Sequence, residues 1–183
     1  DVYFLYWDHT QGMFQAVGYL YALGHRKLGL IEGLPNTFAC RSRTEAFKMR
    51  LADYGLPFRR EWAAGDDFTR ESGYYAMQAI LRCKERPTAV VCQSDAIAVG
   101  AMSALKQVGL SCPGGMSIVG YDDIEVSRHL TPALTTVRQD TVLLGRLAAD
   151  TIVQAITGAD TPRKQILPVS LIVRDSCQRV EQT

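Results

Sequence analysis

Apolar residues recur along this chain in two alternating patterns. Short continuous runs, typical of buried strands, alternate with longer stretches in which apolar residues recur at helical spacing. The runs that predict strands lie at 1–7, Leu28–Ile31, Pro57–Ala63, Thr88–Cys92, Met116–Tyr121, Leu134–Val137 and Gln165–Val173. The helical stretches lie at Gln11–Leu23, Arg43–Tyr54, Thr69–Cys83, Ala96–Val108, Ile124–Leu130 and Thr141–Thr157. A glycine follows four of these stretches, as expected where helices end.

This order of elements predicts an α/β fold class. Strands that are separated by crossover helices do not pair as hairpins, so a doubly wound, mostly parallel sheet with helices on both faces is expected. In such sheets the ligand crevice lies beyond the carboxyl ends of the strands. The polar and aromatic residues that follow predicted strands are therefore candidates for a site: Asp8, His9, Arg41, Arg43, Phe68, Ser94, Asp95, Asp122 and Asp123.

Composition and charge narrow the classes of protein. The chain has 183 residues, 47% of them hydrophobic, which is enough for a substantial core in one large domain. Its net charge is +1 and its charged residues are mixed, so it has no basic stripe of the kind that binds a row of phosphates. These residues are not expected to bind nucleic acid themselves.

The five cysteines indicate a reducing compartment. Their number is odd, they show no CxxC spacing, and three lie in apolar runs where a thiol acts as a small hydrophobe. No apolar stretch approaches the about 18 residues of a membrane span, and no secretory leader opens the chain. We therefore expect a cytoplasmic protein without a membrane partner. The strand-like run at the first residue predicts that the true N-terminus lies upstream.

Five segments together resemble the lactose-repressor/galactose-repressor (LacI/GalR) family of bacterial transcription regulators. They are LGHRK at 23–27, RTEAF at 43–47, PTAVV at 87–91 followed by SD at 94–95, SIVGYDD at 117–123, and TPALTTVRQ at 131–139. Each segment alone is weak, but their order and spacing cover nearly the whole chain. The resemblance implies an effector-binding domain of periplasmic-binding-protein-like fold, in which two lobes joined by three crossing strands hold the effector between them.

The resemblance also implies a domain organisation. Residues 1–9 would be a remnant strand of the N-terminal lobe, and 10–138 a largely complete C-terminal lobe. Residues 139–164 would return as a helix to the N-terminal lobe, and 165–183 would form the last crossover, final strand and tail. The helix-turn-helix head and most of the first lobe would be missing. Apolar residues of the returning helix would then be exposed, disordered or covered by another molecule: Leu143, Leu144, Leu147, Ile152 and Ile156.

Two residues are the main ligand candidates by this resemblance. Arg43 aligns with the family's effector-contacting arginine, and a guanidinium grips vicinal hydroxyls or a carboxylate through parallel donors. The alternative is a surface arginine that opens a helix. Asp122 aligns with the acceptor of sugar hydroxyls, while its alternative is to cap the short helix near Ile124. We assign that cap to Asp123 instead.

Further ligand candidates are Ser94, Phe68, Asp8 and Gln139. Ser94 stands where many family members have asparagine, which puts the identity of the effector in doubt. Phe68 matches an aromatic that lies against the ligand ring, or else folds onto its own lobe. Asp8 and Gln139 lie at crossing segments and either reach the cleft or bond the hinge strands. Asp95 is assigned as the N-cap of the following helix.

Neither the histidines nor any sequence motif indicates a metal site or a catalytic site. His25 follows a helix-ending glycine and is assigned to the last carbonyls of that helix. His9 and His129 have no partner at metal spacing, so neither a metal nor another cofactor is predicted. The sequence contains no GxSxG, Walker A or GxGxxG motif, and we predict no enzyme activity.

The predicted function is therefore effector sensing within a transcriptional repressor. A sugar or related small metabolite would bind between lobes of a homodimer, and operator DNA would be bound only through the missing head. The alternative is a periplasmic sugar-binding protein of a transport system, which shares the architecture. The cysteines and the LTTVRQ segment argue against that alternative.

Overall fold

The computed structural model describes residues 2–180, and residues 1 and 181–183 of the predicted first and last segments lie outside the described residues. Helices and strands alternate as the sequence predicts. The strands are β1 (Phe4–Trp7), β2 (Leu28–Ile31), β3 (Ala63–Ala64), β4 (Ala89–Cys92), β5 (Ser117–Asp122), β6 (Thr135–Arg138), β7 (Lys164–Leu167) and β8 (Ser170–Ile172). The helices are α1 (His9–Ala22), α2 (Phe38–Asp53), α3 (Arg70–Leu81), α4 (Asp95–Gln107) and α5 (Thr141–Thr157), with 3-10 turns at Arg60–Trp62 and Glu125–Arg128.

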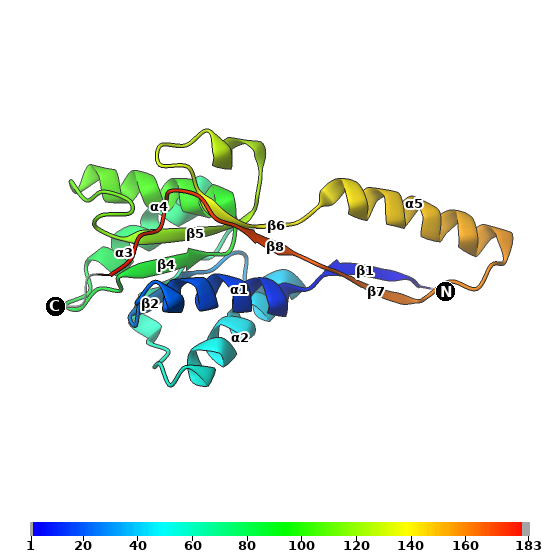
Figure 1. The fold of residues 1–183 in the computed structure, drawn as a ribbon, viewed down its shortest axis with the longest axis horizontal. Coiled ribbons are helices and arrows are strands. Elements are labelled where there is room, and N and C mark those ends of the chain that lie inside the picture. The colour runs from blue at the N-terminus through cyan, green and yellow to red at the C-terminus, as the bar shows by residue number, and fades with distance from the viewer. Residues whose placement is uncertain (1, 181–183) are drawn as a thin grey trace.

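Six of these strands form one sheet in the order β3-β2-β4-β5-β6-β8. Its pairs are parallel except that β8 runs antiparallel to β6. Helices α1 and α2 cover one face and α3 and α4 the other, each with its own apolar cluster (Figure 1). The predicted α/β, mostly parallel, doubly wound fold is confirmed.

The helices α3 and α4 pack closely because glycines face the neighbouring backbone. A Cβ added at Gly73 would lie 2.2 Å from the Ile97 carbonyl oxygen, and one at Gly100 would lie 1.9 Å from that of Arg70. A side chain larger than hydrogen therefore does not fit at either position without separating the helices.

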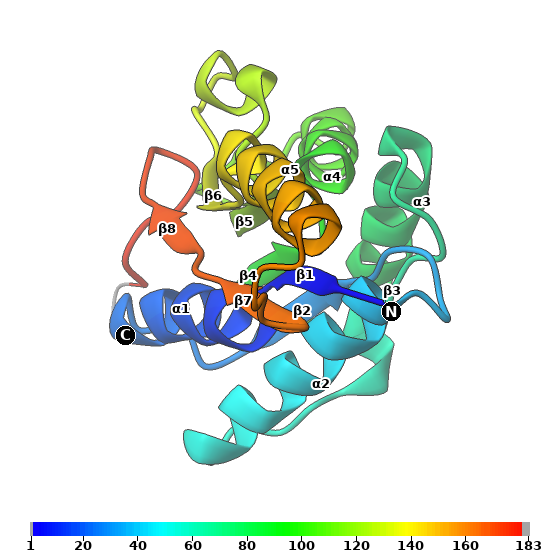
Figure 2. The ribbon, with the colours of Figure 1, turned by 90° about the vertical axis from the view of Figure 1, so that its right-hand side faces the viewer.

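The remaining elements form an extension that projects from this lobe. Strands β1 and β7 pair parallel in a separate two-stranded sheet, and α5 lies beside β1 (Figures 1 and 2). Leu143, Leu144 and Leu147 are partly buried against the first apolar cluster, whereas Ile152 and Ile156 are 60% and 79% exposed. The predicted exposure is thus right for the two isoleucines and wrong for the three leucines. The alternative that this segment is disordered is wrong, because α5 is a regular helix through Thr157. Cover of its exposed residues by another molecule stays a prediction.

Three predicted element boundaries are wrong for local reasons. The strand expected at Pro57–Ala63 is reduced to β3, because a 3-10 turn occupies Arg60–Trp62. The final strand is divided at Pro168, which has no N–H to donate to a ladder. Helix α2 begins at Phe38 with Thr37 as its N-cap, five residues before the predicted start. None of the helices among the described residues is long and apolar enough to span a membrane.

Candidate binding site at the carboxyl edge of the sheet

The carboxyl ends of the parallel strands bring several predicted residues together. Arg43 lies in the second turn of α2, whose N-terminus follows β2, and points toward the ends of β4 and β5. Its guanidinium is 3.7 Å from the centre of the Tyr121 ring, and its Nη2 is 3.8 Å from Asp122 Oδ1. Arg43 is only 4% exposed, so the alternative of a surface arginine that opens a helix is wrong.

The remaining contacts of Arg43 fix its orientation. Its Nη1 donates to the carbonyl oxygen of Gln93, the residue directly after β4. Its Nε donates to His9 Nδ1 at 3.4 Å. Burial lowers the pKa of Arg43, and the nearby Tyr121 and Asp122 counteract that shift. Because Arg43 Nη2 makes only the long contact with Asp122, its N–H groups stay available to donate to a further acceptor.

His9 was a candidate only by its position after the first strand, and the sequence analysis gave it no ligand role. It is 7% exposed, and burial together with the charge of Arg43 lowers its pKa to about 4. The ring is therefore neutral at neutral pH, and since Nδ1 accepts from Arg43 its proton lies on Nε2. The available signal was its place directly after a strand, but no motif marked it.

The strand end at Asp122 is conformationally strained. Asp122 has φ of 115° and Asp123 has φ of 56°, values that L-residues rarely adopt. Burial raises the pKa of the Asp122 carboxyl to about 7, although Arg43 opposes this shift. Its side chain is still 34% exposed, so one face remains open to a ligand. Such strain at adjacent residues is typical of functional sites.

Asp123 does not cap the following turn, contrary to prediction. Its carboxylate accepts from Arg174 Nη2 and from Arg138 Nε, both at 2.6 Å, while the turn at Ile124 has no side-chain cap. Burial alone would raise the pKa of Asp123, but these hydrogen bonds and charges lower it. Arg138 is the last residue of β6, which continues toward the extension, whereas Arg174 follows β8 and also donates to Leu134 O. Asp123 therefore ties the strained turn to the end of β6 and to the segment after β8.

Ser94, and not Asp95, is the N-cap of the helix that follows β4. The Ser94 hydroxyl accepts from Ile97 N and is the N-cap of α4, so the assignment of that cap to Asp95 is wrong. The fully buried Asp95 carboxylate instead accepts from Ile124 N at 2.9 Å and from the hydroxyls of Ser127 and Thr136 at 2.5 Å each. Burial raises its pKa, against the effect of these hydrogen bonds. It holds the segment after Asp123 against β6.

Gln93 is a residue of the site that the sequence analysis missed. Its side chain is fully buried, accepts from Gly33 N, and donates to Cys40 O and to Thr44 Oγ1. It thereby joins the end of β2 to α2, while its own carbonyl receives Arg43. The network positions α2, and with it Arg43, relative to β4.

Three further predicted ligand residues, Phe68, Asp8 and Gln139, do not contact the Arg43 side chain and make other contacts within the chain. Phe68 is partly buried in the second apolar cluster, and its ring lies where a Cβ on Gly33 would fall, 2.1 Å from Cε1. Asp8 is the N-cap of α1 and accepts from Gln11 N at 2.8 Å. Gln139 follows β6, its N–H donates to Asp122 O, and its buried Nε2 has no partner among the described residues. Ligand binding by Phe68, Ser94, Asp8 and Gln139 stays a prediction.

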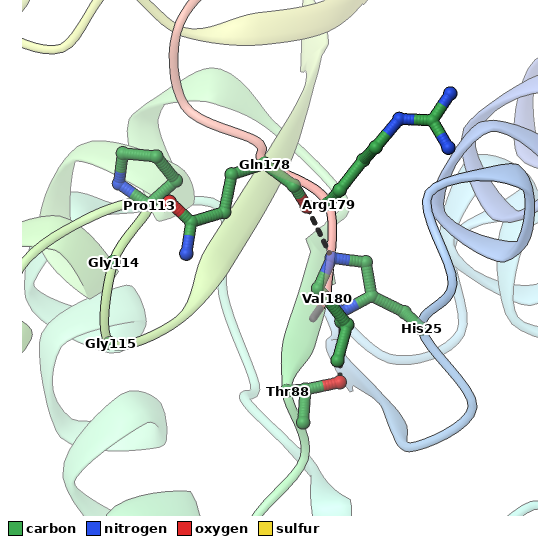
Figure 3. Close-up of a pocket in the computed structure, with 8 residues that line it drawn as sticks. All are labelled: His25, Thr88, Pro113, Gly114, Gly115, Gln178, Arg179 and Val180. Carbon is green, nitrogen blue, oxygen red and sulfur yellow. Dashed lines mark hydrogen bonds between the residues drawn. The ribbon is translucent and has the colours of Figure 1, made fainter. Parts of the chain in front are cut away.

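A separate cavity of about 340 Å³ lies at the opposite, amino edge of the sheet (Figure 3). It is lined by His25, Thr88, Pro113, Gly114, Gly115, Gln178, Arg179 and Val180. The His25 ring bonds Thr88 Oγ1 at 2.8 Å and Gln178 O at 3.1 Å, so its assignment to helix carbonyls is wrong. Arg26 instead donates to Tyr21 O. In the close-up the Arg179 guanidinium points away from His25, and the cavity contains no converging charged groups.

Metal and disulfide chemistry have no structural support in the part of the chain that the structure describes. No group of three or more histidine, cysteine or acidic side chains could hold a metal ion there. All five cysteines are free thiols, and Cys40 and Cys92 are buried.

Comparison with known proteins gives a consistent set of similarities. Residues 17–177 match the family described as periplasmic binding protein-like domain. The chain is 37% identical to the HTH-type transcriptional repressor PurR of Haemophilus influenzae (strain PittEE) over 178 residues, 94% of this chain and 53% of that protein. The chain thus spans about half the length of the curated relatives it matches.

Solved structures agree with this similarity. A dimeric Lac repressor with a C-terminal deletion and one substitution superposes with a TM-score of 0.91 at 32% identity, over 96% of this chain and 64% of that one. A complex of the transcriptional regulator CelR with cellobiose superposes with a TM-score of 0.90 at 32% identity, over 96% of this chain and 54% of that one.

Proposed function

Because this chain belongs to the LacI/GalR family and contains its periplasmic binding protein-like domain, we propose that it senses a small, neutral, polyhydroxylated effector. The observation that carries this proposal is the buried Arg43 guanidinium facing the partly open Asp122 carboxylate at 3.8 Å. That separation is too long for a direct hydrogen bond, so both groups are free to bond a ligand.

The chemistry of the pair favours adjacent hydroxyl groups. Arg43 donates to one hydroxyl oxygen, while Asp122 accepts from its neighbour, as polar groups in mostly apolar sites fix ligand orientation. The pair is neutral overall when Asp122 is ionised. The positive charge of Arg43 is therefore already balanced, and the Asp122 carboxylate would repel a strongly anionic effector. The Nε2 proton of His9 adds a third donor beside Arg43. A sugar or a related polyol fits this set, and the CelR structure contains the sugar cellobiose.

The effector acts within a transcriptional repressor, as in the relatives named above, and not as the substrate of an enzyme. Binding would shift the angle between two lobes and so change how a cytoplasmic homodimer presents DNA-binding heads. Operator DNA would be contacted through a part of the protein outside this chain, which has a net charge of only +1. Coupling of this kind is typically worth ~1–3 kcal/mol.

The division into lobes follows the same proposal. Residues 10–138 would be the C-terminal lobe, and 1–9, 139–164 and 165–183 would cross to the N-terminal lobe or return from it. The separate β1–β7 sheet and the projecting α5 support this division (Figure 1). Strand β6 then leads into a crossing segment, and its last residue, Arg138, is bonded by Asp123 of the site.

A thermal-shift screen of the full-length protein against sugars, alditols and sugar phosphates tests the proposal, since a ligand that binds only the folded state raises its stability. We expect a neutral sugar to give a shift that Arg43→Ala and Asp122→Asn abolish. The matched controls are Arg41→Ala and Asp53→Asn, which remove similar charges from exposed positions of α2. A shift that survives both site variants would contradict the proposed site, and turnover of the sugar would contradict the sensing function.

A further inference from the structure

We propose that Tyr6, His9 and Phe38 form an aromatic wall of the site, and that the effector is a cyclic molecule that places a flat apolar face against Phe38. This inference rests on the proposed function and names the shape of its ligand. Phe38 was not a candidate in the sequence analysis, because it lies outside the segments that carry the family resemblance.

The three rings come from three elements that meet at the site. Tyr6 lies on β1, His9 opens α1 and Phe38 opens α2. The Phe38 ring centre is 5.4 Å from that of Tyr6, edge to face at 81°, and 5.9 Å from that of His9. These are favourable separations for aromatic pairs, so the ring is held from two sides. Phe38 is nevertheless 56% exposed, which leaves a preformed apolar surface open.

The aromatic wall is continuous with the polar pair of the site. His9 accepts the Arg43 Nε hydrogen bond and lies 6.2 Å from Tyr121, whose ring packs under the Arg43 guanidinium. Because His9 is neutral, it adds no charge between the apolar and the polar part. A ligand that bonds Arg43 and Asp122 with its hydroxyls therefore meets an aromatic surface on one side. The C–H face of a sugar ring matches that surface, whereas an open-chain polyol does not.

Phe68, the aromatic that the resemblance selects, is less free for this role. Its ring lies directly over Gly33 and packs into the second apolar cluster within its own lobe. Phe38 has no such partner beyond Tyr6 and His9 in the aromatic contacts of the described residues. The open ring, and not the packed one, is available to a ligand.

One buried polar group beside Asp122 gives independent support for a ligand here. Gln139 Nε2, next to Asp122 along the sheet edge, is buried without a hydrogen-bond partner among the described residues. Buried polar groups are normally paired in proteins, so this unpaired amide indicates that a bound molecule or its water completes it.

The test compares cyclic sugars with their alditols, which keep the hydroxyl groups but lose the ring face. Binding of D-glucose, D-galactose, D-mannose and D-ribose and of their four alditols to the full-length protein is measured by titration calorimetry. We expect at least one sugar to bind about tenfold or more tightly than its alditol, as an aromatic contact implies. Phe38→Ala should reduce this preference to about twofold, and Phe38→Tyr should restore it.

The variants separate failure of the inference from failure of the proposed function. Tyr75→Ala, which removes an aromatic that is 59% exposed on α3, controls for the loss of a surface ring. A ring preference that survives Phe38→Ala, or that disappears in Phe68→Leu instead, would overturn the inference alone. An alditol that binds wild type as well as its sugar would do the same. Absence of binding by every probe would reject the proposed function together with the inference.

Discussion

Helices α4 and α5 have similar apolar patterns but different surroundings. Helix α4 buries seven of its residues, including Ile97, Ala101 and Leu105, between the sheet and α3. Helix α5 buries only Thr151, and Val142, Ile152, Val153 and Ile156 are exposed. An amphipathic pattern therefore shows that a helix can bury a face, whereas the presence of a packing layer decides whether it does.

The same contrast separates the six-stranded lobe from the extension as a whole. In the lobe, each face of the sheet is covered by two helices and has its own apolar cluster. In the extension, two paired strands and α5 have one side without a covering layer, and Phe4 and Ile166 are 58% and 54% exposed. The strained turn at Asp122 and Asp123 lies where the two regions join. Substitutions in matched positions test how far this difference controls stability.

The largest expected contrast is between two truncations of apolar side chains. Leu105→Ala in α4 removes fully buried atoms and should destabilise the protein by ~2–5 kcal/mol, because a cavity adds to the lost burial. Ile156→Ala in α5 should change stability by less than ~0.5 kcal/mol, because that side chain is 79% exposed. Urea denaturation followed by circular dichroism measures both. Equal losses would mean that α5 is covered in solution.

Two glycine-to-alanine substitutions should have opposite signs. Gly100→Ala forces a Cβ against the Arg70 carbonyl and should cost ~1–3 kcal/mol through overpacking. Gly145→Ala meets nothing within 4 Å and should stabilise α5 by ~0.5–1 kcal/mol, since alanine favours the helix. Amide hydrogen exchange of the two helices provides the measurement. Destabilisation by Gly145→Ala would contradict this prediction, because it would mean that another molecule packs against Gly145.

The join between the two regions should depend on Asp123. Asp123→Asn keeps a residue that tolerates the positive φ but removes the charge that Arg138 and Arg174 bond, at a cost of ~2 kcal/mol. Because the folded state lowers the pKa of this group, the loss should be fully present above its unfolded pKa and vanish as pH falls through the folded value. Asp150→Asn on α5 is the exposed control. Denaturation at several pH values checks the effect, and a loss that persists in acid would contradict it.

The smallest expected effect is the pH dependence of Asp122. Burial raises its pKa from 3.8 to about 7, so the folded state keeps a proton that the unfolded state releases across that window. The contribution of Asp122 to the free energy of unfolding should therefore fall as pH rises from 4 to 7. The expected fall is on the order of 1 kcal/mol, because solvent screens a side chain that is 34% exposed. Asp122→Asn should therefore gain stability relative to wild type as pH rises. His9 has a pKa of about 4 and contributes with the opposite sign, but it is present in both proteins and cancels in the comparison.

The periodicity of the chain was sufficient to predict the fold. Alternating apolar runs and helical stretches indicated the crossover topology, because strands joined by helices pair in parallel. The residues after β1, β4 and β5 were predicted to be candidates, since carboxyl ends share one edge of a parallel sheet. That reasoning placed Arg43 and Asp122 at a common edge, and the structure brings them to 3.8 Å.

Individual side-chain roles were less accessible from sequence. Asp95 and Asp123 were assigned by local capping rules, yet Asp95 bonds residues 29 to 41 positions away and Asp123 bonds residues 15 and 51 positions away. Local rules describe only neighbours in the chain. A carboxylate that finds better partners across the fold leaves its cap to another residue, as Asp95 does to Ser94.

The sequence by itself determined which segments form helices and strands, which edge of the sheet carries the site, and which family the chain belongs to. Only the tertiary structure decided that Arg43 is buried against Tyr121, that His9 is neutral beside it, and that Phe38 is open while Phe68 is packed. The physical reason is that periodicity and motifs are properties of neighbours along the chain. Burial, charge state and exposure depend instead on which distant residues the fold brings within a few ångströms.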